Sequence, residues 1–366
     1  MSRETVLITG ATGFIGLSIL HGLLRAGYQV KAVVRSDSRA QWLANRLQTM
    51  TDVSGAQRVE FVSVPNFVLP GAFDRAVAGV QYIVHVASPI TSTDNEQDWQ
   101  RDFVDTAVEG SVGLLEAAAR TGTVKRIVIT SSMVAMLPLA TLFRGLPSSI
   151  PLDAESRSHN MQPPYPAKMM AYAAGKIAAL NAAEAWVAEH QPSFDVIHVC
   201  PSFVTGYDRT ATTASELCKG SNWHSLSIVL GTTHEIGKPA LTCHIDDVVR
   251  CHVQGLDPAV PGNQCYLVSC DGSEGLAWDA AKDVVQSRFP AEVANGLLPN
   301  NGSMPTTKVR LDVSKTEAAF GFEHIPFEHQ VAEVVGQYLE LLAVDKEQLG
   351  GAGGDGGGVD ARWTGP

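Results

Sequence analysis

The chain has 366 residues, of which 45% are hydrophobic and 18% are charged, and its formal net charge is −11. This composition is typical of a globular protein with a sizeable core, and the negative charge argues against nucleic acid or an anionic membrane as a partner. We therefore expect small molecules as partners, and either a monomer or a homodimer.

Neither a secretion signal nor a membrane-spanning segment is recognisable in the sequence. The first apolar run begins at Thr5, which leaves no room for a signal peptide. The longest nearly apolar run, 133–143, contains Pro138 and is shorter than the roughly 20 residues that a spanning helix needs. Six cysteines without a C-x-x-C pair favour reduced thiols. We expect no membrane partner and a cytoplasmic protein.

A glycine-rich turn between a strand and a helix is the first feature of the chain. The apolar run 5–8 predicts the strand, and apolar residues at helical spacing up to Leu24 predict the helix. A helix N-terminus preceded by glycines offers free N–H groups and close approach to a pyrophosphate. The stretch therefore predicts a dinucleotide cradle made of Gly10, Thr12, Gly13, Phe14, Ile15 and Gly16.

The second predicted strand, 30–34, ends at the position that selects between cofactors in a dinucleotide-binding fold. An acid at this position binds the ribose 2′-hydroxyl of NAD, whereas an arginine can pair with the 2′-phosphate of NADP. Arg35 stands there, with Ser36 and Arg39 close by, and favours NADP(H) over NAD. A solvated charged loop is the alternative interpretation, and Asp37 could still serve a 2′-hydroxyl.

Two further strands are predicted at 59–62 and 82–86, and the second contains a histidine. A lone histidine inside an apolar strand is more often a hydrogen-bonded core residue than a base, so His85 is not assigned to catalysis. A helix is predicted over 98–120. Gly110 and Gly113 within it suggest that another element packs closely against this helix.

The fifth predicted strand, 126–130, places Ser131 and Ser132 at its carboxyl end, where open parallel sheets have their ligand crevice. Prolines at 163–166 prevent a helix before residue 167, and the helix that follows runs to about His190. Tyr172 and Lys176 lie four residues apart on one face of it. We expect the ammonium to lower the pKa of the phenol from about 10 and to make it a usable proton donor.

The string TGATGFIG, taken with Tyr172-Ala173-Ala174-Gly175-Lys176, resembles the extended short-chain dehydrogenase/reductase superfamily, and within it the dihydroflavonol-reductase-like aldehyde and ketone reductases. The resemblance covers about residues 5–342. It implies an α/β fold with a Rossmann-type doubly wound parallel sheet and a smaller C-terminal substrate lobe. It also implies the catalytic set Ser132, Tyr172 and Lys176, and cofactor contacts by Lys176, Asn66, Ala87, Ser88, Pro201 and Val204.

Two departures from the family pattern are visible in this chain. Many relatives carry an asparagine on the helix 98–120, where this chain has Ala107 or Gly113, so a proton relay must use other groups. The proline that usually follows the glycine of the loop along the nicotinamide is Tyr207 here, after Gly206.

The alternation of strands and helices fades after residue 200. We expect a NADP-binding domain over 1–200, a substrate-binding lobe over 201–345 interleaved with the last strands, and a disordered glycine-rich tail over 346–366. A strand at 265–269 and helices at 278–289 and 327–343 are predicted within the lobe. The pairs Cys243-His244 and Cys251-His252 match no common zinc spacing, so no metal is expected.

Apolar residues after Ser132 and in the lobe predict the substrate pocket, formed by Val134, Met136, Leu137, Phe203 and Trp223. Plant dihydroflavonol reductases have a flavonoid-reading asparagine at the position of Leu137, and the residues before Tyr172 lack the string of plant cinnamoyl-CoA reductases. The sequence favours an NADPH-dependent ketoreductase of secondary metabolism, acting on an aromatic or polyketide-derived ketone or aldehyde.

Two other functions remain as alternatives to a ketoreductase. The first is an NAD-dependent nucleotide-sugar epimerase or dehydratase of the same superfamily, against which Arg35 and the apolar loop after Ser132 argue. The second is a dinucleotide-sensing regulator without turnover, against which the intact set of serine, tyrosine and lysine argues.

Overall fold

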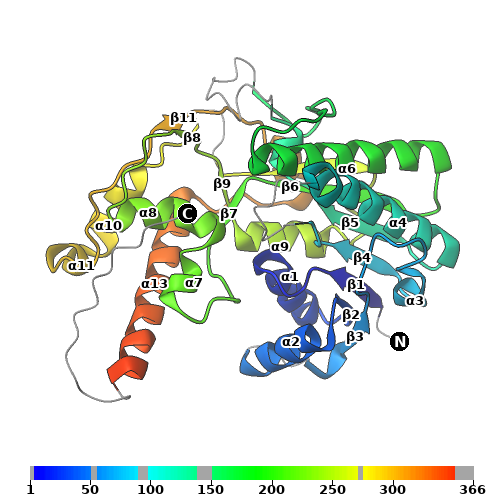
Figure 1. The fold of residues 1–366 in the computed structure, drawn as a ribbon, viewed down its shortest axis with the longest axis horizontal. Coiled ribbons are helices and arrows are strands. Elements are labelled where there is room, and N and C mark those ends of the chain that lie inside the picture. Colours follow the sequence, from blue (N-terminus) through cyan, green and yellow to red (C-terminus); the bar gives the residue numbers. More distant parts are fainter. Residues whose placement is uncertain (1–3, 51–55, 90–97, 138–150, 271–274, 351–366) are drawn as a thin grey trace.

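The computed structural model of the chain describes residues 4–50, 56–89, 98–137, 151–270 and 275–350. A parallel sheet with helices on both faces forms the larger part of the molecule, and a mainly helical lobe lies beside it (Figure 1). Within the described residues, no helix has the length and apolar character that crossing a membrane requires.

The central sheet has seven strands, and its neighbouring strands are all parallel. The order is β10-β6-β5-β4-β1-β2-β3, so the direction of strand addition reverses between β1 and β4. A ligand crevice forms at such a reversal, outside the carboxyl ends of the strands. The predicted doubly wound sheet is therefore confirmed, with the strands β1 (Thr5–Thr9), β2 (Gln29–Val34), β3 (Val59–Ser63), β4 (Tyr82–His85), β5 (Arg126–Thr130), β6 (Asp195–Pro201) and β10 (Gln264–Val268).

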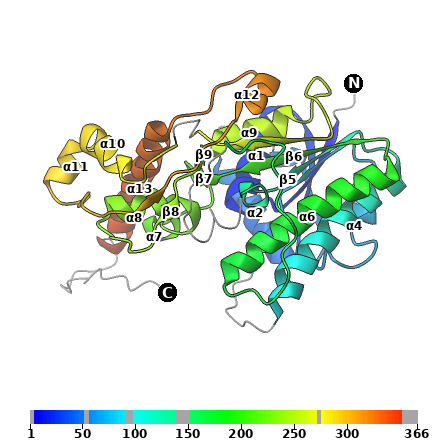
Figure 2. The same cartoon turned by 90° about the horizontal axis from the view of Figure 1, so that it is seen from above.

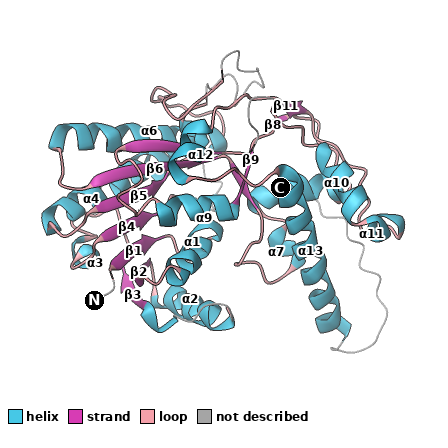
Figure 3. Cartoon of the chain, turned by 180° about the vertical axis from the view of Figure 1, so that it is seen from behind, coloured by secondary structure: helices cyan, strands magenta, loops and turns pink. Residues whose placement is uncertain are grey.

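Helices cover both faces of the sheet (Figure 3). One face carries α1 (Phe14–Arg25), α2 (Asp37–Thr49), α9 (Ile245–Gln254) and α12 (Ser314–Phe320). The other face carries α3 (Asp74–Val77), α4 (Thr106–Thr121) and α6 (Lys168–His190). Strands covered on both faces are apolar on both faces, which explains their nearly continuous hydrophobic sequences.

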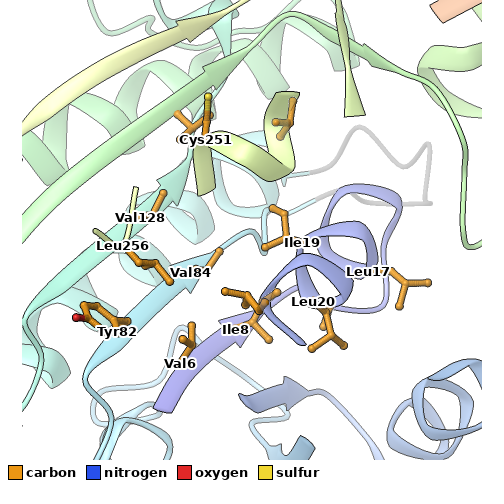
Figure 4. Close-up of a cluster of buried hydrophobic side chains, with 14 of the residues drawn as sticks. Val6, Ile8, Leu17, Ile19, Leu20, Tyr82, Val84, Val128, Cys251 and Leu256 are labelled. Carbon is orange, nitrogen blue, oxygen red and sulfur yellow. The ribbon is translucent and has the colours of Figure 1, made fainter. Parts of the chain in front are cut away.

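The two faces of β1 belong to two separate parts of the core. Val6 and Ile8 pack in one cluster with Leu20 of α1 and Cys251 of α9, as Figure 4 shows. Leu7 packs in the second cluster, on the side of α3 and α4. Because successive side chains of a strand alternate between faces, the buried run after residue 4 anchors helices on both sides of the sheet.

Helix α6 lies directly on the segment that precedes α4. This segment, Gln100–Asp105, is a π-helix at the start of the predicted helix 98–120. A Cβ atom at Gly175 of α6 would lie 2.6 Å from the carbonyl oxygen of Phe103, so only glycine permits this approach. In α4, a Cβ at Gly110 would lie 2.5 Å from the Phe67 ring, which confirms the close packing expected there. A Cβ at Gly113 would have no neighbouring atom within 4 Å, so the expectation of close packing is wrong at Gly113.

The lobe lies to one side of the sheet and its helices (Figure 2). It has its own apolar core around the fully buried Trp278. The strand pair β7 (Phe203–Thr205) and β9 (Thr242–His244) joins it to the main sheet region. Its other elements are α7 (Ala214–Leu217), α8 (Trp223–Val229), α10 (Ala280–Arg288), α11 (Pro290–Ala294), α13 (Phe327–Gly350) and the strands β8 (Lys238–Pro239) and β11 (Thr306–Thr307).

Elements of the main sheet region lie within the expected lobe range, and the last helix extends into the expected tail. Within 201–345, where interleaving with the last strands was expected, β10 is a strand of the main sheet, and α9 and α12 pack on that sheet. Helix α13 continues to Gly350, so residues 346–350 are helical where a tail was expected from 346. The rest of the expected tail, 351–366, lies outside the described residues.

The glycine turn after β1 yields the first prediction, because a Cβ at Gly16 would lie only 2.0 Å from the carbonyl oxygen of Gly10. Gly16→Ala should lower the free energy of unfolding by on the order of 3 kcal/mol, since the turn must open. Gly113→Ala is the control. It lies in the interior of α4 with open space around it, and should raise the free energy of unfolding by up to about 1 kcal/mol. Denaturant unfolding measures both, and similar changes in the two variants would contradict the packing described here.

Candidate active site

The glycine turn has the shape that a dinucleotide pyrophosphate requires. Gly10 has a φ of +74°, and a Cβ there would lie 2.7 Å from the backbone nitrogen of Ala87. Gly13 begins α1 without a side-chain cap, and the nearest atom to a Cβ there would be 3.7 Å away, so the N-terminal N–H groups of the helix remain accessible. Thr12, Phe14 and Ile15 are half-buried around the turn. These residues fit the predicted cofactor.

Two arginines stand at the end of β2, where a 2′-phosphate is expected. The side chains of Arg35 and Arg39 are exposed, and neither has an acidic partner within the described residues. Ser36 caps α2, where its hydroxyl accepts a hydrogen bond from the N–H of Arg39 at 3.4 Å. Asn66 is exposed at the neighbouring strand end, and its Oδ1 accepts the N–H of Val68 at 3.3 Å.

Ser132 and Tyr172 meet at the carboxyl edge of the sheet. Ser132 leaves β5 and caps a short 3-10 helix, Met133–Ala135, while Tyr172 lies in the first turns of α6. The Ser132 hydroxyl lies close enough to the Tyr172 phenol to influence its pKa. Burial raises the pKa of Tyr172 above 10, and the Ser132 hydroxyl partly offsets that rise. The phenol is therefore held as an acid at neutral pH.

Lys176 lies one turn further along α6, with its ammonium in the layer between the helix and the sheet. Its side chain is 9% exposed, and Nζ donates a hydrogen bond to the carbonyl oxygen of Thr130 at 3.1 Å. Burial lowers its pKa from 10.5 to about 8. The expected lowering of the Tyr172 pKa by this ammonium is not found, because burial prevails and the only group that lowers it is Ser132.

A small hollow of about 30 Å³ lies beside Lys176, between the ends of three strands and helices α4 and α6. Two of the expected cofactor contacts, Ala87 and Ser88, lie at it together with Lys176. None of the five residues expected to form the substrate pocket lines it. Its polar lining consists of His85, Ser88, Thr106, Ser111, Thr130, Ser131, Lys176 and His198.

The five residues expected in the substrate pocket differ in how deeply they are buried. Met136 and Leu137 are each only 2% exposed and belong to a core cluster, so they are packing residues and not an open lining. Val134, Phe203 and Trp223 are half-buried. The apolar residues Leu139, Leu142 and Phe143, which follow Leu137 in the sequence, lie outside the described residues.

Two further cofactor predictions fall on β6 and β7. Pro201 ends β6 and pairs with Val268 in the sheet. Val204 is 4% exposed and its side chain belongs to the core, so it can contact a cofactor only through its backbone.

The histidines of the two cysteine-histidine pairs bind protein groups. His244 Nε2 lies 2.8 Å from a carboxylate oxygen of Glu333. His252 Nε2 lies 2.7 Å from the hydroxyl of Thr130, and its Nδ1 lies 2.7 Å from the carbonyl oxygen of Val248. Hydrogen bonding within the fold accounts for both side chains.

Two residues at the site were not identified from the sequence. His198 lies on the same sheet face as Ser131 and lines the hollow, although its strand reads as an ordinary apolar run. His224 of α8 packs against Phe203, with ring centroids 4.4 Å apart and nearly perpendicular planes. For His198, the sequence offered one indication. Side chains alternate between the two faces of a strand, which places His198 on the same face of β6 as Val196 and Cys200.

Known proteins resemble this chain in sequence and in fold. The profile of the NAD dependent epimerase/dehydratase family matches residues 6–265. The chain is 56% identical over 350 residues to Ketoreductase CTB6 of Cercospora nicotianae, covering 94% of this chain and 98% of that protein. It is 34% identical over 337 residues to the NAD-dependent epimerase/dehydratase ALT6 of Alternaria alternata, covering 87% and 93%. The solved structure of yeast methylglyoxal/isovaleraldehyde reductase Gre2 complexed with NADPH has a TM-score of 0.73 at 21% identity, covering 92% and 98%, which shows a shared fold.

The buried ammonium gives a prediction for stability against pH. The pKa of Lys176 is about 8 in the folded protein and about 10.4 in the unfolded chain. Burial of the ammonium therefore lowers the free energy of unfolding most below pH 8, and this loss of stability disappears as the pH rises to about 10.4. Lys176→Met should raise the free energy of unfolding at pH 7 by on the order of 2 kcal/mol, after the loss of the bond to Thr130 is counted. This gain should vanish by pH 10.5 in denaturant unfolding. A difference that does not change with pH would contradict the lowered pKa.

Proposed function

We propose that this chain, which belongs to the NAD dependent epimerase/dehydratase family, is an NADPH-dependent ketoreductase. The observation that carries the proposal is the neighbouring pair of Ser132 and Tyr172 at the carboxyl edge of the sheet, with Lys176 one turn further along α6. The glycine turn packs against Ala87, which lies at the same hollow as Lys176. The 56% identity to a protein named ketoreductase supports an oxidoreductase that acts on a carbonyl group.

Residues already described would hold the cofactor of the proposed reaction. A nicotinamide dinucleotide is supported by the family match and by the NADPH in the Gre2 structure. The turn from Gly10 to Gly16 would hold the pyrophosphate, and Arg35 and Arg39 would pair with the 2′-phosphate that distinguishes NADPH from NADH. When bound, NADPH supplies the hydride.

The protein's own groups manage the oxygen and the proton of the reaction. Ser132 donates a hydrogen bond to the carbonyl oxygen of the substrate and holds it beside Tyr172. Tyr172 gives its proton to the oxygen as negative charge develops there, and its raised pKa keeps that proton in place until then. Lys176, with a pKa of about 8, is mostly charged at pH 7 and would donate a hydrogen bond to the nicotinamide ribose.

The substrate proposal is an aromatic or polyketide-derived ketone or aldehyde of secondary metabolism. Phe203 follows β6 directly, and its ring contacts His224 at 4.4 Å and Trp278 at 6.2 Å between centroids. Trp278 is fully buried, so the mainly apolar surface on offer consists of the half-buried Phe203, Trp223 and Val134. Such a surface suits an aryl group better than a charged sugar nucleotide.

Oxidation of NADPH against a panel of carbonyl compounds tests the function. We expect turnover of aromatic ketones or aldehydes and none of nucleotide sugars. Tyr172→Phe should retain NADPH binding and lose at least about 100-fold in kcat, because the ring remains while the transferable proton is removed.

Two results of this assay would contradict the proposal. Turnover of nucleotide sugars alone would identify the epimerase or dehydratase alternative. Binding of NADPH without turnover of any compound would favour a dinucleotide sensor. Near wild-type turnover by Tyr172→Phe would remove the tyrosine from its assigned role.

The two exposed arginines at the end of β2 yield a prediction about cofactor choice. Arg35→Ala should weaken NADPH binding by about 1.5–3 kcal/mol and leave NADH binding nearly unchanged, because only NADPH carries the 2′-phosphate. Arg25→Ala is the control, since Arg25 is equally exposed but lies at the far end of α1. Fluorescence titration measures the affinities. Equal losses for both cofactors would contradict the assignment.

A further inference from the structure

The face of the sheet that meets α4 and α6 is apolar except at the carboxyl ends of its central strands. There, His85 of β4, Ser131 after β5 and His198 of β6 are all buried and all line the hollow beside Lys176. Ser111 of α4 completes the polar lining. A buried polar group usually has a partner, so this arrangement in an otherwise apolar layer calls for a function.

The hydrogen bonds of Thr9 fix the tautomer of His85. The hydroxyl oxygen of Thr9 accepts the backbone N–H groups of Val86 at 3.2 Å and Ala87 at 3.1 Å. A hydroxyl has two acceptor positions and one proton, so the Thr9 proton is left for His85 Nδ1, which lies 2.8 Å away. Nδ1 is therefore the acceptor, and the proton of the neutral imidazole is on Nε2.

The imidazole ring of His85 lines the hollow. Its Nε2–H group has no protein acceptor within the described residues. Two other buried atoms at the hollow, Ser131 Oγ and His198 Nδ1, likewise have no protein partner there. Of the three protons on Lys176 Nζ, one is given to Thr130. The hollow is thus polar enough to hold ordered water, which needs two to four such partners.

We propose that His85 is a positioning residue for the reaction: its Nε2–H, oriented by Thr9, holds a water molecule in the hollow that accepts a hydrogen bond from Lys176. The water solvates the buried ammonium in addition to the carbonyl of Thr130. Without it, the charged form of Lys176 loses a hydrogen bond and becomes less stable. The inference rests on the proposed function, because it concerns the lysine of the proposed catalytic set.

The charges around His85 agree with a donor that remains neutral. Burial and the ammonium of Lys176 lower the pKa of His85 to about 4. Burial likewise lowers the pKa of His198, on β6, to about 4. From the other neighbouring elements, Thr9 of β1, Ser111 of α4 and the Phe73 ring at 6.4 Å carry no charge. At neutral pH, Lys176 therefore faces a hydrogen-bond donor to water and not a second cation.

Two amide substitutions separate the two nitrogens of the ring. In His85→Asn the amide occupies the place of Nδ1, so the contact with Thr9 is retained and the donor at Nε2 is lost. In His85→Gln the amide reaches the place of Nε2, so a donor to the hollow is retained. Both remove a buried imidazole, and each is therefore the control for the other.

We expect His85→Asn to move the alkaline fall of kcat for ketone reduction to lower pH by about one unit, because the ammonium loses its solvating water. His85→Gln should keep the wild-type profile, and the KM for NADPH should be unchanged in both variants. The pH at which the free energy of unfolding begins to rise, measured without cofactor or substrate, should shift in the same way.

Nitrogen-15 NMR of labelled histidine gives a direct test on the cofactor-free protein. The signal that disappears in His85→Asn should have the shifts of a neutral Nε2–H imidazole at pH 7. An Nδ1–H tautomer, or equal shifts of the pH profiles in the two variants, would overturn the inference. If no carbonyl compound is reduced, the NMR and unfolding measurements still decide it, so its failure and that of the proposed function are distinguishable.

Discussion

A positive charge in an apolar layer is the constraint around which the site is arranged. Lys176 places its ammonium between the sheet and α6, where the carbonyl of Thr130 and the polar hollow replace part of the lost solvation. The burial that lowers the pKa of Lys176 also raises that of Tyr172, because it disfavours the charged form of each group. At neutral pH the phenol therefore keeps its proton while most of the ammonium remains charged.

Features of this site that depend on local spacing were predictable from the sequence. The turn of Gly10, Gly13 and Gly16 follows from its place between a strand and a helix, and the structure has this turn at the reversal of strand order. Tyr172 and Lys176 follow from helical periodicity and the prolines before residue 167. Residues close together in the sequence determine these geometries, so the sequence alone is enough to predict them.

Features that depend on packing between distant segments could not be predicted in the same way. Met136 and Leu137 are apolar whether they line a pocket or fill the core, and only the structure shows that they are buried. The lowered pKa of Lys176 depends on its depth beneath the sheet edge, and the tautomer of His85 depends on two amides that bind Thr9. Spacing along the chain carries no information about burial or about the group to which a hydroxyl donates its proton.

The replacement of the usual proline by Tyr207 links the lobe to the cofactor side of the molecule. A proline has no N–H, whereas the N–H of Tyr207 donates to Glu333 of α13 at 2.7 Å. The same carboxylate oxygen lies 2.8 Å from His244, and a Cβ at Gly206 would come within 2.9 Å of it, so glycine is required there. Burial opposes a charge on His244, yet its bond to Glu333 leaves its pKa raised while that of Glu333 is lowered. The loop that leaves β7 is thus fastened to α13 through Glu333, and the same carboxylate forms a partly buried ionic contact with His244 of β9.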